Sequence, residues 1–354
     1  MNTLVKMLSQ FVKKMLNTYN QIKRFMKKII ILLSIILANI GSTQASVITG
    51  TCGSGLTWSL NTKDSTLTIE GSGNMQNWQS PSGTTPFTPW SEYRSYITNV
   101  NLPNTLRYIS EYAFSYCENL KNIIIPNSVT TIRKGAFFCC YNLPSINIPN
   151  SVTSIEGRAF YDCHKLNSII IPDNVTAIGG GAFSGCTQLA TATLSPNITI
   201  IEDETFRHCT HLLTIDIPDN VTSIGQVAFH NCWGIETIII GSQVKIIKKE
   251  AFSECRTLKS ITCKAVTPPT CESDPFKYIS NIKSIKLYVP EESVEAYSNA
   301  LWWEDFIILP IGAAQEALDN INVSKTLPQK ILKEGQIVIE QGNKIYTLQG
   351  QKVQ

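Results

Sequence analysis

The sequence predicts a repeat solenoid: a β-rich stack of coils with a parallel sheet on one face, short helical or 3-10 turns, and a cap at each end. Three observations predict it. One motif recurs every 23 residues without a gap over residues 97–257. Its isoleucines alternate with other residues as they do in a strand, and a phenylalanine and a cysteine return at fixed places in each copy. A strict period of this size is typical of a solenoid in which each copy forms one coil.

The seven copies share the pattern L-x-x-I-x-I-P-x-x-V-T-x-I-x-x-x-A-F-x-x-C-x-x. Isoleucines two residues apart, such as Ile123 and Ile125, lie on one face of a short strand. A proline then ends most of these strands, because it has no N–H for the ladder. The Val-Thr-x-Ile element predicts a second extended piece, and Ala-Phe predicts a helical or 3-10 turn that closes the coil. The copies are Ile97–Asn119, Leu120–Asn142, Leu143–Lys165, Leu166–Gln188, Leu189–His211, Leu212–Gly234 and Ile235–Thr257.

These elements resemble the bacterial surface leucine-rich repeat of the BspA type, with its I-x-I-P, V-T-x-I and A-F-x-x-C segments. The resemblance covers residues 97–257 well and the flanking segments loosely. It implies a solenoid of the leucine-rich-repeat type, and proteins similar to this one are surface adhesins or secreted binding proteins. The motif lacks the asparagine that follows the strand in the common leucine-rich repeat, so we expect no asparagine ladder.

The first 45 residues predict a signal peptide. A largely apolar stretch over residues 29–40 follows Lys27-Lys28, and the small-residue segment ending at Ala45 fits a cleavage site. The stretch is too short to span a hydrocarbon core of ~30 Å, so a membrane anchor is the weaker interpretation. Met26 is an alternative start. We expect no membrane span in the mature chain, and an extracellular or outer-surface location.

The charge of the remaining chain excludes one class of function. Residues 1–45 hold seven of the 30 Lys/Arg and none of the 27 Asp/Glu, which leaves 23 basic and 27 acidic residues, a net charge of −4. Binding to nucleic acid relies on clustered Lys/Arg that neutralise phosphates, and no such cluster is present. Nucleic acid is therefore not an expected partner.

Both ends of a stack must cover its apolar core. Residues 46–96 predict an N-terminal β cap with a hairpin formed by residues 56–60 and 66–70. Residues 258–311 predict degenerate repeats and a C-terminal helical cap, with a strand over residues 282–287. One helix face would carry Val294, Tyr297, Ala300 and Leu301, and Trp302, Trp303 and Phe306 would seal the end or form an exposed platform for a sugar.

Residues 312–354 predict a linker and a short C-terminal β tail. Three segments of it look like strands, at residues 331–332, 336–339 and 344–348, and turn sequences separate them. The last segment is similar to the C-terminal tails of exported bacterial proteins that are sorted to the outer surface. A plain terminal meander explains the same sequence, so sorting stays one of two interpretations.

The cysteines are the most conspicuous chemical group. Seven of the 11 recur at the 23-residue spacing, and we interpret them as buried free thiols. Cys263 and Cys271 close a short loop that contains two prolines, and they are the candidate disulfide in an oxidising compartment.

We expect no metal, no cofactor and no catalytic residue. His208 and His211 flank Cys209, but this cysteine belongs to the repeating column. The glycines at 179–181 lie in a variable repeat segment and do not form a phosphate-binding loop.

The candidate binding surface is the outward face of the strands. Its side chains are mostly small, hydroxyl-bearing or amide-bearing, with a few exposed isoleucines, and β propensity alone also explains such residues. The expected partner is a host or bacterial surface protein or a glycan. A self-associating structural protein is the alternative, and an ice-binding face would need a more regular threonine array. The candidate residues are Asn101, Asn122, Ile124, Ser145, Asn147, Ser168, Ile170, Thr191, Thr193, Thr214, Asp216, Thr237 and Ile239.

Overall fold

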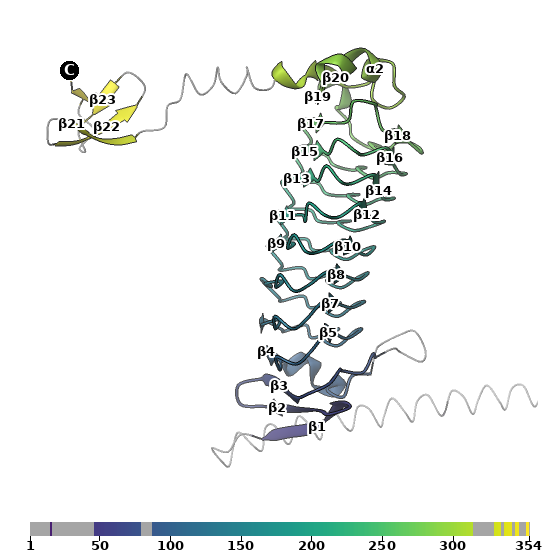
Figure 1. Ribbon diagram of the computed structural model, residues 1–354, viewed down its shortest axis with the longest axis vertical. Helices are drawn as coiled ribbons and strands as arrows, with labels where there is room; N and C mark the ends of the chain where they lie inside the picture. Colours follow the sequence, from purple (N-terminus) through teal and green to yellow (C-terminus); the bar gives the residue numbers. More distant parts are fainter. Residues whose placement is uncertain are drawn as a thin grey trace, which may run out of the picture.

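A computed structural model of the chain describes Met15, residues 46–78 and 87–313, and four short strands between residues 329 and 353. Residues 46–313 form a stack of parallel coils that is closed by a cap at each end (Figure 1). The predicted signal peptide, apart from Met15, lies outside the described residues. The repeat solenoid that the sequence predicts is confirmed.

One side of the stack is a column of strands formed by the I-x-I segments. Within each of its sheets, a strand pairs in parallel with the strand of the next coil, as Ile215 does with Ile238, 23 residues later. The inward residues are buried and the outward ones are mostly exposed, as the alternating pattern requires. The strands are β4 (Asn99–Asn101), β6 (Asn122–Ile123), β9 (Ser168–Ile170), β11 (Thr191–Thr193), β13 (Thr214–Ile217), β15 (Thr237–Ile240), β17 (Ser260–Cys263), β19 (Lys286–Val289) and β20 (Ile307–Pro310).

The coil Leu143–Lys165 departs from this column. Its segment with Ile146 and Ile148 forms no strand, although the structure describes every residue of it. In other coils the second residue donates a hydrogen bond to the preceding coil, as Lys121 does to the carbonyl of Thr98 at 2.8 Å. Pro144 occupies that place and has no N–H, so the ladder is interrupted. The prediction of a strand in this coil is therefore wrong.

A second column of two-residue strands comes from the V-T-x-I segments. In all but the last of them, an inward isoleucine such as Ile155 is buried, and the last has the half-buried Cys271 at that position. The predicted second extended piece is confirmed. The strands are β5 (Tyr108–Ile109), β7 (Thr131–Ile132), β8 (Ser154–Ile155), β10 (Ala177–Ile178), β12 (Ile200–Ile201), β14 (Ser223–Ile224), β16 (Ile246–Ile247) and β18 (Thr270–Cys271).

The third side of each coil is a run of tight turns. Hydrogen bonds of the 3-10 type are present, such as Ala136 N–H to the carbonyl of Arg133 at 3.1 Å, but no helix is assigned within residues 97–257. Two residues per coil have positive φ and interrupt the helical path, for example Glu204 at 61° and His208 at 62°. Phe137 N–H instead reaches the carbonyl of Ala159 in the next coil, at 2.8 Å, so this side is also linked from coil to coil.

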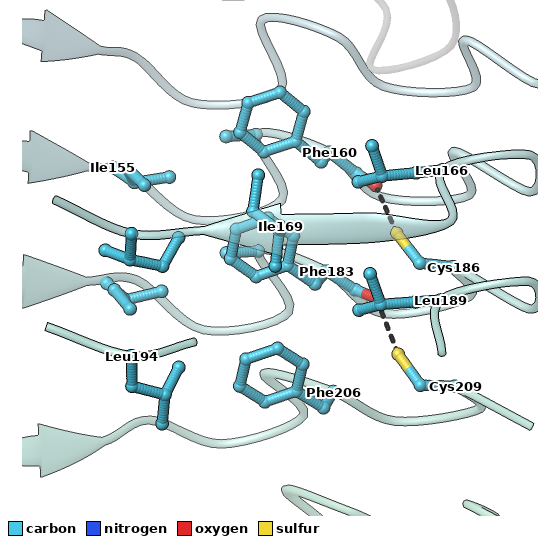
Figure 2. Packing of buried hydrophobic residues seen from close by; sticks show 14 of the residues in the cluster. Ile155, Phe160, Leu166, Ile169, Phe183, Cys186, Leu189, Leu194, Phe206 and Cys209 are labelled. Atoms are coloured by element: carbon cyan, nitrogen blue, oxygen red, sulfur yellow. Dashed lines mark hydrogen bonds between the residues drawn. The ribbon is translucent and has the colours of Figure 1, made fainter. Parts of the chain in front are cut away.

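The core consists of one column for each apolar position of the repeat. The seven phenylalanine rings are fully buried and stack with centroids 5.2 to 5.6 Å apart. Trp90 continues the stack at one end and Phe276 at the other, where Trp303 packs edge-on against Phe276. Figure 2 shows Phe160, Phe183 and Phe206 stacked beside the leucine and cysteine columns. The rings are Phe114, Phe137, Phe160, Phe183, Phe206, Phe229 and Phe252.

The N-terminal cap is an antiparallel sheet whose last strand pairs with the first strand of the solenoid. The strands β1 (Val47–Gly53), β2 (Leu56–Asn61) and β3 (Thr66–Gly71) pair in order, and β3 then pairs in parallel with β4. The hairpin of β2 and β3 is the predicted one, whereas β1 was not expected. The short helix η1 (Ser91–Tyr96) follows, and Trp78 and Trp90 are buried against the first coil.

The C-terminal cap differs from its prediction in two places. The segment 282–284 is the 3-10 helix η2 (Ile282–Ser284), so the strand begins only at Lys286. The helices η3 (Glu291–Ser293) and α2 (Val294–Ser298) bury Tyr297, but Leu301 is 66% exposed because α2 ends three residues before it.

Among the aromatic residues of this cap, Trp303 and Phe306 are buried and Trp302 is half-buried. Burial of two of the three rings rules out a flat exposed aromatic platform at this end.

The tail contains four antiparallel strands, one more than expected. They are β21 (Gln329–Lys333), β22 (Gln336–Gln341), β23 (Lys344–Tyr346) and β24 (Lys352–Val353). In the part of the chain that the structure describes, no helix is long and apolar enough to cross a membrane.

Candidate functional site

The thirteen candidate surface residues all lie outside the buried core. Eleven are exposed, and Thr237 and Ile239 are half-buried. The sequence pattern therefore assigned their direction correctly, although exposure by itself does not make them a binding site.

Register brings these residues together in two lanes along the stack. Thr191 pairs with Ser168 in one lane, and Thr193 pairs with Ile170 in the other. Higher in the stack, Thr214 pairs with Thr237 and Asp216 pairs with Ile239. Because parallel neighbours are about 4.8 Å apart, each lane presents one side chain per coil at that spacing.

Two isoleucines on this face are strongly exposed. Ile124 is 83% exposed and Ile170 is 70% exposed, while the isoleucines that flank each of them in the sequence are buried. They occupy equivalent positions two coils apart, so they lie about 10 Å from one another. Covering these side chains with a partner is favourable. Complete burial of one isoleucine contributes about 1.5–3 kcal/mol to the binding free energy.

A groove of about 520 Å³ opens beside these lanes, between β11 and β13. Thr193 and Asp216 of the candidate surface line it, together with Ala192, Pro218, Asp219 and Lys264 among others. β11 and β13 are adjacent in the stack, yet they belong to separate hydrogen-bonded sheets. The groove thus lies at a break in the strand column.

The two aspartates in the groove have different surroundings. Asp219 Oδ1 accepts the backbone N–H of Ser242 at 3.0 Å and lies 3.5 Å from Lys264 Nζ. The hydrogen bond from Ser242, followed by the charge of Lys264, lowers the pKa of Asp219 below its ordinary value. Among the described residues, none bonds to or pairs with the Asp216 carboxylate, which is exposed.

The sequence had indicated Thr193 and Asp216 but not the other residues of the groove. A signal was present, because Ala192 stands where the neighbouring coils carry Ile169 and Ile215. The strand-ending proline is also one residue late in this coil, at Pro196. Whether such departures open a groove depends on the packing of adjacent coils, which the repeat pattern does not specify.

The cysteine column is structural. All seven of its thiols are free and fully buried, which confirms the interpretation as buried thiols. From Cys140 onward, each Sγ donates to the carbonyl of the phenylalanine 26 residues earlier, at 3.1 to 3.5 Å. Figure 2 shows two of these bonds, from Cys186 to Phe160 and from Cys209 to Phe183.

The predicted disulfide between Cys263 and Cys271 is not formed, and both residues are free thiols. Cys263 ends β17 in the first strand column, whereas Cys271 ends β18 in the second, so they belong to different sheets. Cys263 Sγ accepts the hydroxyl of Tyr297 at 3.1 Å, and Cys271 Sγ faces the carbonyl of Pro269 at 3.7 Å.

The histidines make local bonds between neighbouring coils. His208 Nδ1 lies 2.7 Å from the side-chain amide of Asn231, and His230 Nδ1 lies 2.6 Å from Ser253 Oγ. Burial and then the charge of Arg207 lower the pKa of both imidazoles. No group of three or more His, Cys, Asp or Glu with the geometry of a metal site occurs among the described residues.

The glycines at 179–181 serve coil packing. A side chain on Gly179 would approach the backbone nitrogen of Gly157 to 2.4 Å, and Gly181 has a positive φ of 64°. Close backbone contact and turn geometry therefore account for these glycines.

The stacked parallel coils, the two caps and the exposed strand face define a leucine-rich-repeat solenoid. The profile of the BspA type leucine-rich repeat region matches the chain in six copies, over residues 92–213 and 181–301. Because these matches cover more than half of the sequence, the chain belongs to this family. No curated protein matches it.

Several solved structures are similar. A leucine-rich repeat protein from Bacteroides ovatus ATCC 8483 is 24% identical, with coverage of 70% of this chain and 71% of that chain and a TM-score of 0.47. The leucine-rich repeat protein of T. pallidum is 23% identical over 52% and 90%, with a TM-score of 0.40. A leucine-rich cell surface protein from Faecalibacterium prausnitzii A2-165 is 21% identical over 76% and 96%, with a TM-score of 0.28.

Proposed function

We propose that this chain is a secreted or cell-surface binding protein that docks a protein or a glycan on the outward face of its first strand column. The observation that carries the proposal is the ordered array of eleven exposed side chains on that face, with Ile124 and Ile170 projecting from it. Solenoids commonly bind partners on the extended surface that their stacked repeats create.

The composition of the face supports binding over simple solvation. Strands that only face water need no exposed isoleucines, yet Ile124 and Ile170 expose most of their area at equivalent positions two coils apart. Small hydroxyl and amide side chains lie between them, so a partner can approach the backbone closely and still find hydrogen-bonding groups. Exposed apolar side chains among polar neighbours suit an interaction surface.

The location outside the cell rests on the sequence of residues 27–45 and on the family. A basic segment, an apolar stretch and a small-residue site are the parts of a secretory leader. The repeat family to which the chain belongs is a leucine-rich one, and such solenoids act through surfaces. We therefore propose a non-catalytic protein that acts at the cell surface or in the medium.

The experiment is a screen of residues 46–354 on arrays of glycans and of surface proteins. The chain captures at least one ligand, and the double substitution Thr191→Arg with Thr214→Arg abolishes capture because two long cations then stand on the face. Gln188→Arg with Gln226→Arg is the matched control, since both glutamines are exposed away from the strand face. Capture that survives the threonine pair, or a wild-type chain that captures nothing, contradicts the proposal.

A self-associating structural protein is the second candidate, and the strand β20 favours it. β20 is the last strand of its sheet, and none of the described strands pairs with its outer edge. Ile307 is 44% exposed and Ile311 is 37% exposed near this edge. Unpaired edges accept further strands, so end-to-end association would use it. Sedimentation of residues 46–354 at increasing concentration separates the candidates, because a binding protein stays monomeric and a structural one forms chains.

A further inference from the structure

The groove between β11 and β13 follows from a local departure of the repeat. In the neighbouring coils, the inward isoleucines Ile169 and Ile215 are 2% and 1% exposed. Ala192 occupies the same position and is half-buried, because its single methyl group leaves the space of an isoleucine side chain open. The ladder between the two strands is also interrupted at this point. The opening is therefore part of the ordered architecture of the coil stack.

The groove carries one unmatched negative charge. Its charged residues are Asp216, Asp219 and Lys264. Lys264 already pairs with Asp219, which also holds the N–H of Ser242. The Asp216 carboxylate has no such partner among the described residues and faces the opening. Charge complementarity thus favours a cationic group as the occupant.

Two apolar side chains lie along the lane near that carboxylate, one directly beside it and one two coils away. Ile239 pairs directly with Asp216 on one side, and Ile170, 70% exposed, pairs with Thr193 on the other. An arginine side chain suits this arrangement, because its aliphatic stem covers apolar surface while its guanidinium binds a carboxylate with two parallel hydrogen bonds. A lysine ammonium is a point charge without that geometry.

Other occupants fit less well. A calcium ion takes six to eight oxygen ligands, and the groove offers two carboxylates, one of them already paired with a lysine. A sugar ring commonly stacks on an aromatic side chain, and none of the nine described lining residues is aromatic.

We propose that this groove binds an arginine side chain of a protein partner, with Asp216 as the residue that pairs with the guanidinium. The inference rests on the proposed function and narrows it, since it selects a protein over a glycan at this part of the face. Thr193 and Ile170 then contact the residues of the partner that flank the arginine.

The test is an NMR titration of residues 46–354 with the capped peptide acetyl-Gly-Arg-Gly-amide. Saturable shifts are expected at the amides of Thr193, Asp216 and Asn220. The matched peptide with citrulline, which has the same shape without the charge, binds about 5- to 10-fold more weakly, as expected for loss of one exposed charge pair of about 1 kcal/mol. Equal binding of the two peptides overturns the proposal.

Three variants locate the site. Asp216→Asn weakens binding of the arginine peptide about 5- to 10-fold. Glu202→Gln removes an exposed carboxylate outside the groove and changes the affinity by no more than about twofold. Ala192→Ile restores the residue of the repeat and fills the groove without a change of charge. It weakens binding of the arginine peptide about 10-fold. Retention of full affinity by either groove variant overturns the proposal, and thermal melts confirm that each variant is folded.

The outcome is separable from that of the proposed function. If the array ligand is lost in the threonine pair variant but the arginine peptide does not bind, the strand face stands and the groove assignment fails. If the peptide binds at Asp216 but no array ligand depends on the face, the groove stands as a local site and the wider docking proposal fails.

Discussion

At the scale of single residues, the stack of phenylalanines is the most constrained feature. Phe183 is fully buried, and its ring lies 5.3 Å from that of Phe160 and 5.4 Å from that of Phe206. Cys209 also binds its carbonyl. Each ring therefore packs against two coils as well as its own, so the loss of one ring affects three coils.

Phe183→Ala lowers the free energy of unfolding by about 3–5 kcal/mol, because a close-packed column cannot collapse into the vacated space. Urea melts followed by circular dichroism measure the change. Gln188→Ala, an exposed position of the same coil, shifts the midpoint little. A loss below about 1 kcal/mol for Phe183→Ala would show that the ring column is not close-packed.

The turn residues show what a sequence pattern cannot indicate at this scale. Two positions in every coil hold positive φ, yet only a few of them are glycine. Val227, with φ of 48°, is a β-branched residue in a conformation that such residues avoid. Hydrogen bonds to the neighbouring coils hold these residues in place, such as Val227 N–H to the carbonyl of Lys249 at 3.0 Å. Local composition therefore could not distinguish these turns from a short helix.

At the scale of elements, the stacking of the coils sets the reactivity of the cysteine column. Burial raises the pKa of the Cys232 thiol to about 12, and burial likewise raises the pKa of Cys271, the only half-buried cysteine, to about 12. A thiol with such a pKa is protonated at neutral pH, and only the thiolate reacts readily. The cysteine column is thus inert while the coils remain stacked.

A thiol assay on residues 46–354 gives eleven reactive groups after denaturation and at most one in the native protein. All eleven cysteines are free in the structure and ten are buried. A denatured sample prepared without reductant is the direct comparison with one prepared with it. A denatured count of nine would instead indicate one disulfide, and the pair to examine first would be Cys263 and Cys271.

Strand columns were predictable where the repeat is regular and unpredictable where a single residue alters the ladder. The alternation of isoleucines placed β9, β13 and β15 correctly. Pro144 removes one donor and with it a whole strand. Cys263 and Cys271 end strands of different sheets and are free thiols in the structure, so the pairing suggested by their eight-residue separation stays a prediction for the thiol count.

For the whole molecule, coils are interchangeable units of one length. Deletion of residues 166–188 removes one full period and joins Lys165 to Leu189, so every column keeps its register. We expect a folded, β-rich protein that unfolds cooperatively, with stability reduced by about one coil and its interface. Circular dichroism and a urea melt check this.

Deletion of residues 166–187, shorter by one residue, is the matched control. It shifts inward side chains of one coil to the outward face and should prevent stacking. If both deletions fold equally well, the coil columns do not determine the fold.

The face of the first strand column was predictable in direction, since outward positions follow from alternation. Its groove was not, because the space left by Ala192 and the pairing of Lys264 with Asp219 depend on contacts between residues two coils apart. Sequence repetition thus predicts the average coil, whereas the groove arises from departures from it.

The parallel spacing separates any two positions of one lane by a whole number of coil steps. Ile124 and Asp216 occupy the same lane four steps apart, which corresponds to about 19 Å at ~4.8 Å per step. A partner that touches both must match that length. Gain or loss of one repeat between them would change this distance by one coil step and leave both side chains unchanged. The number of repeats could therefore alter which partner fits, without any substitution at the points of contact.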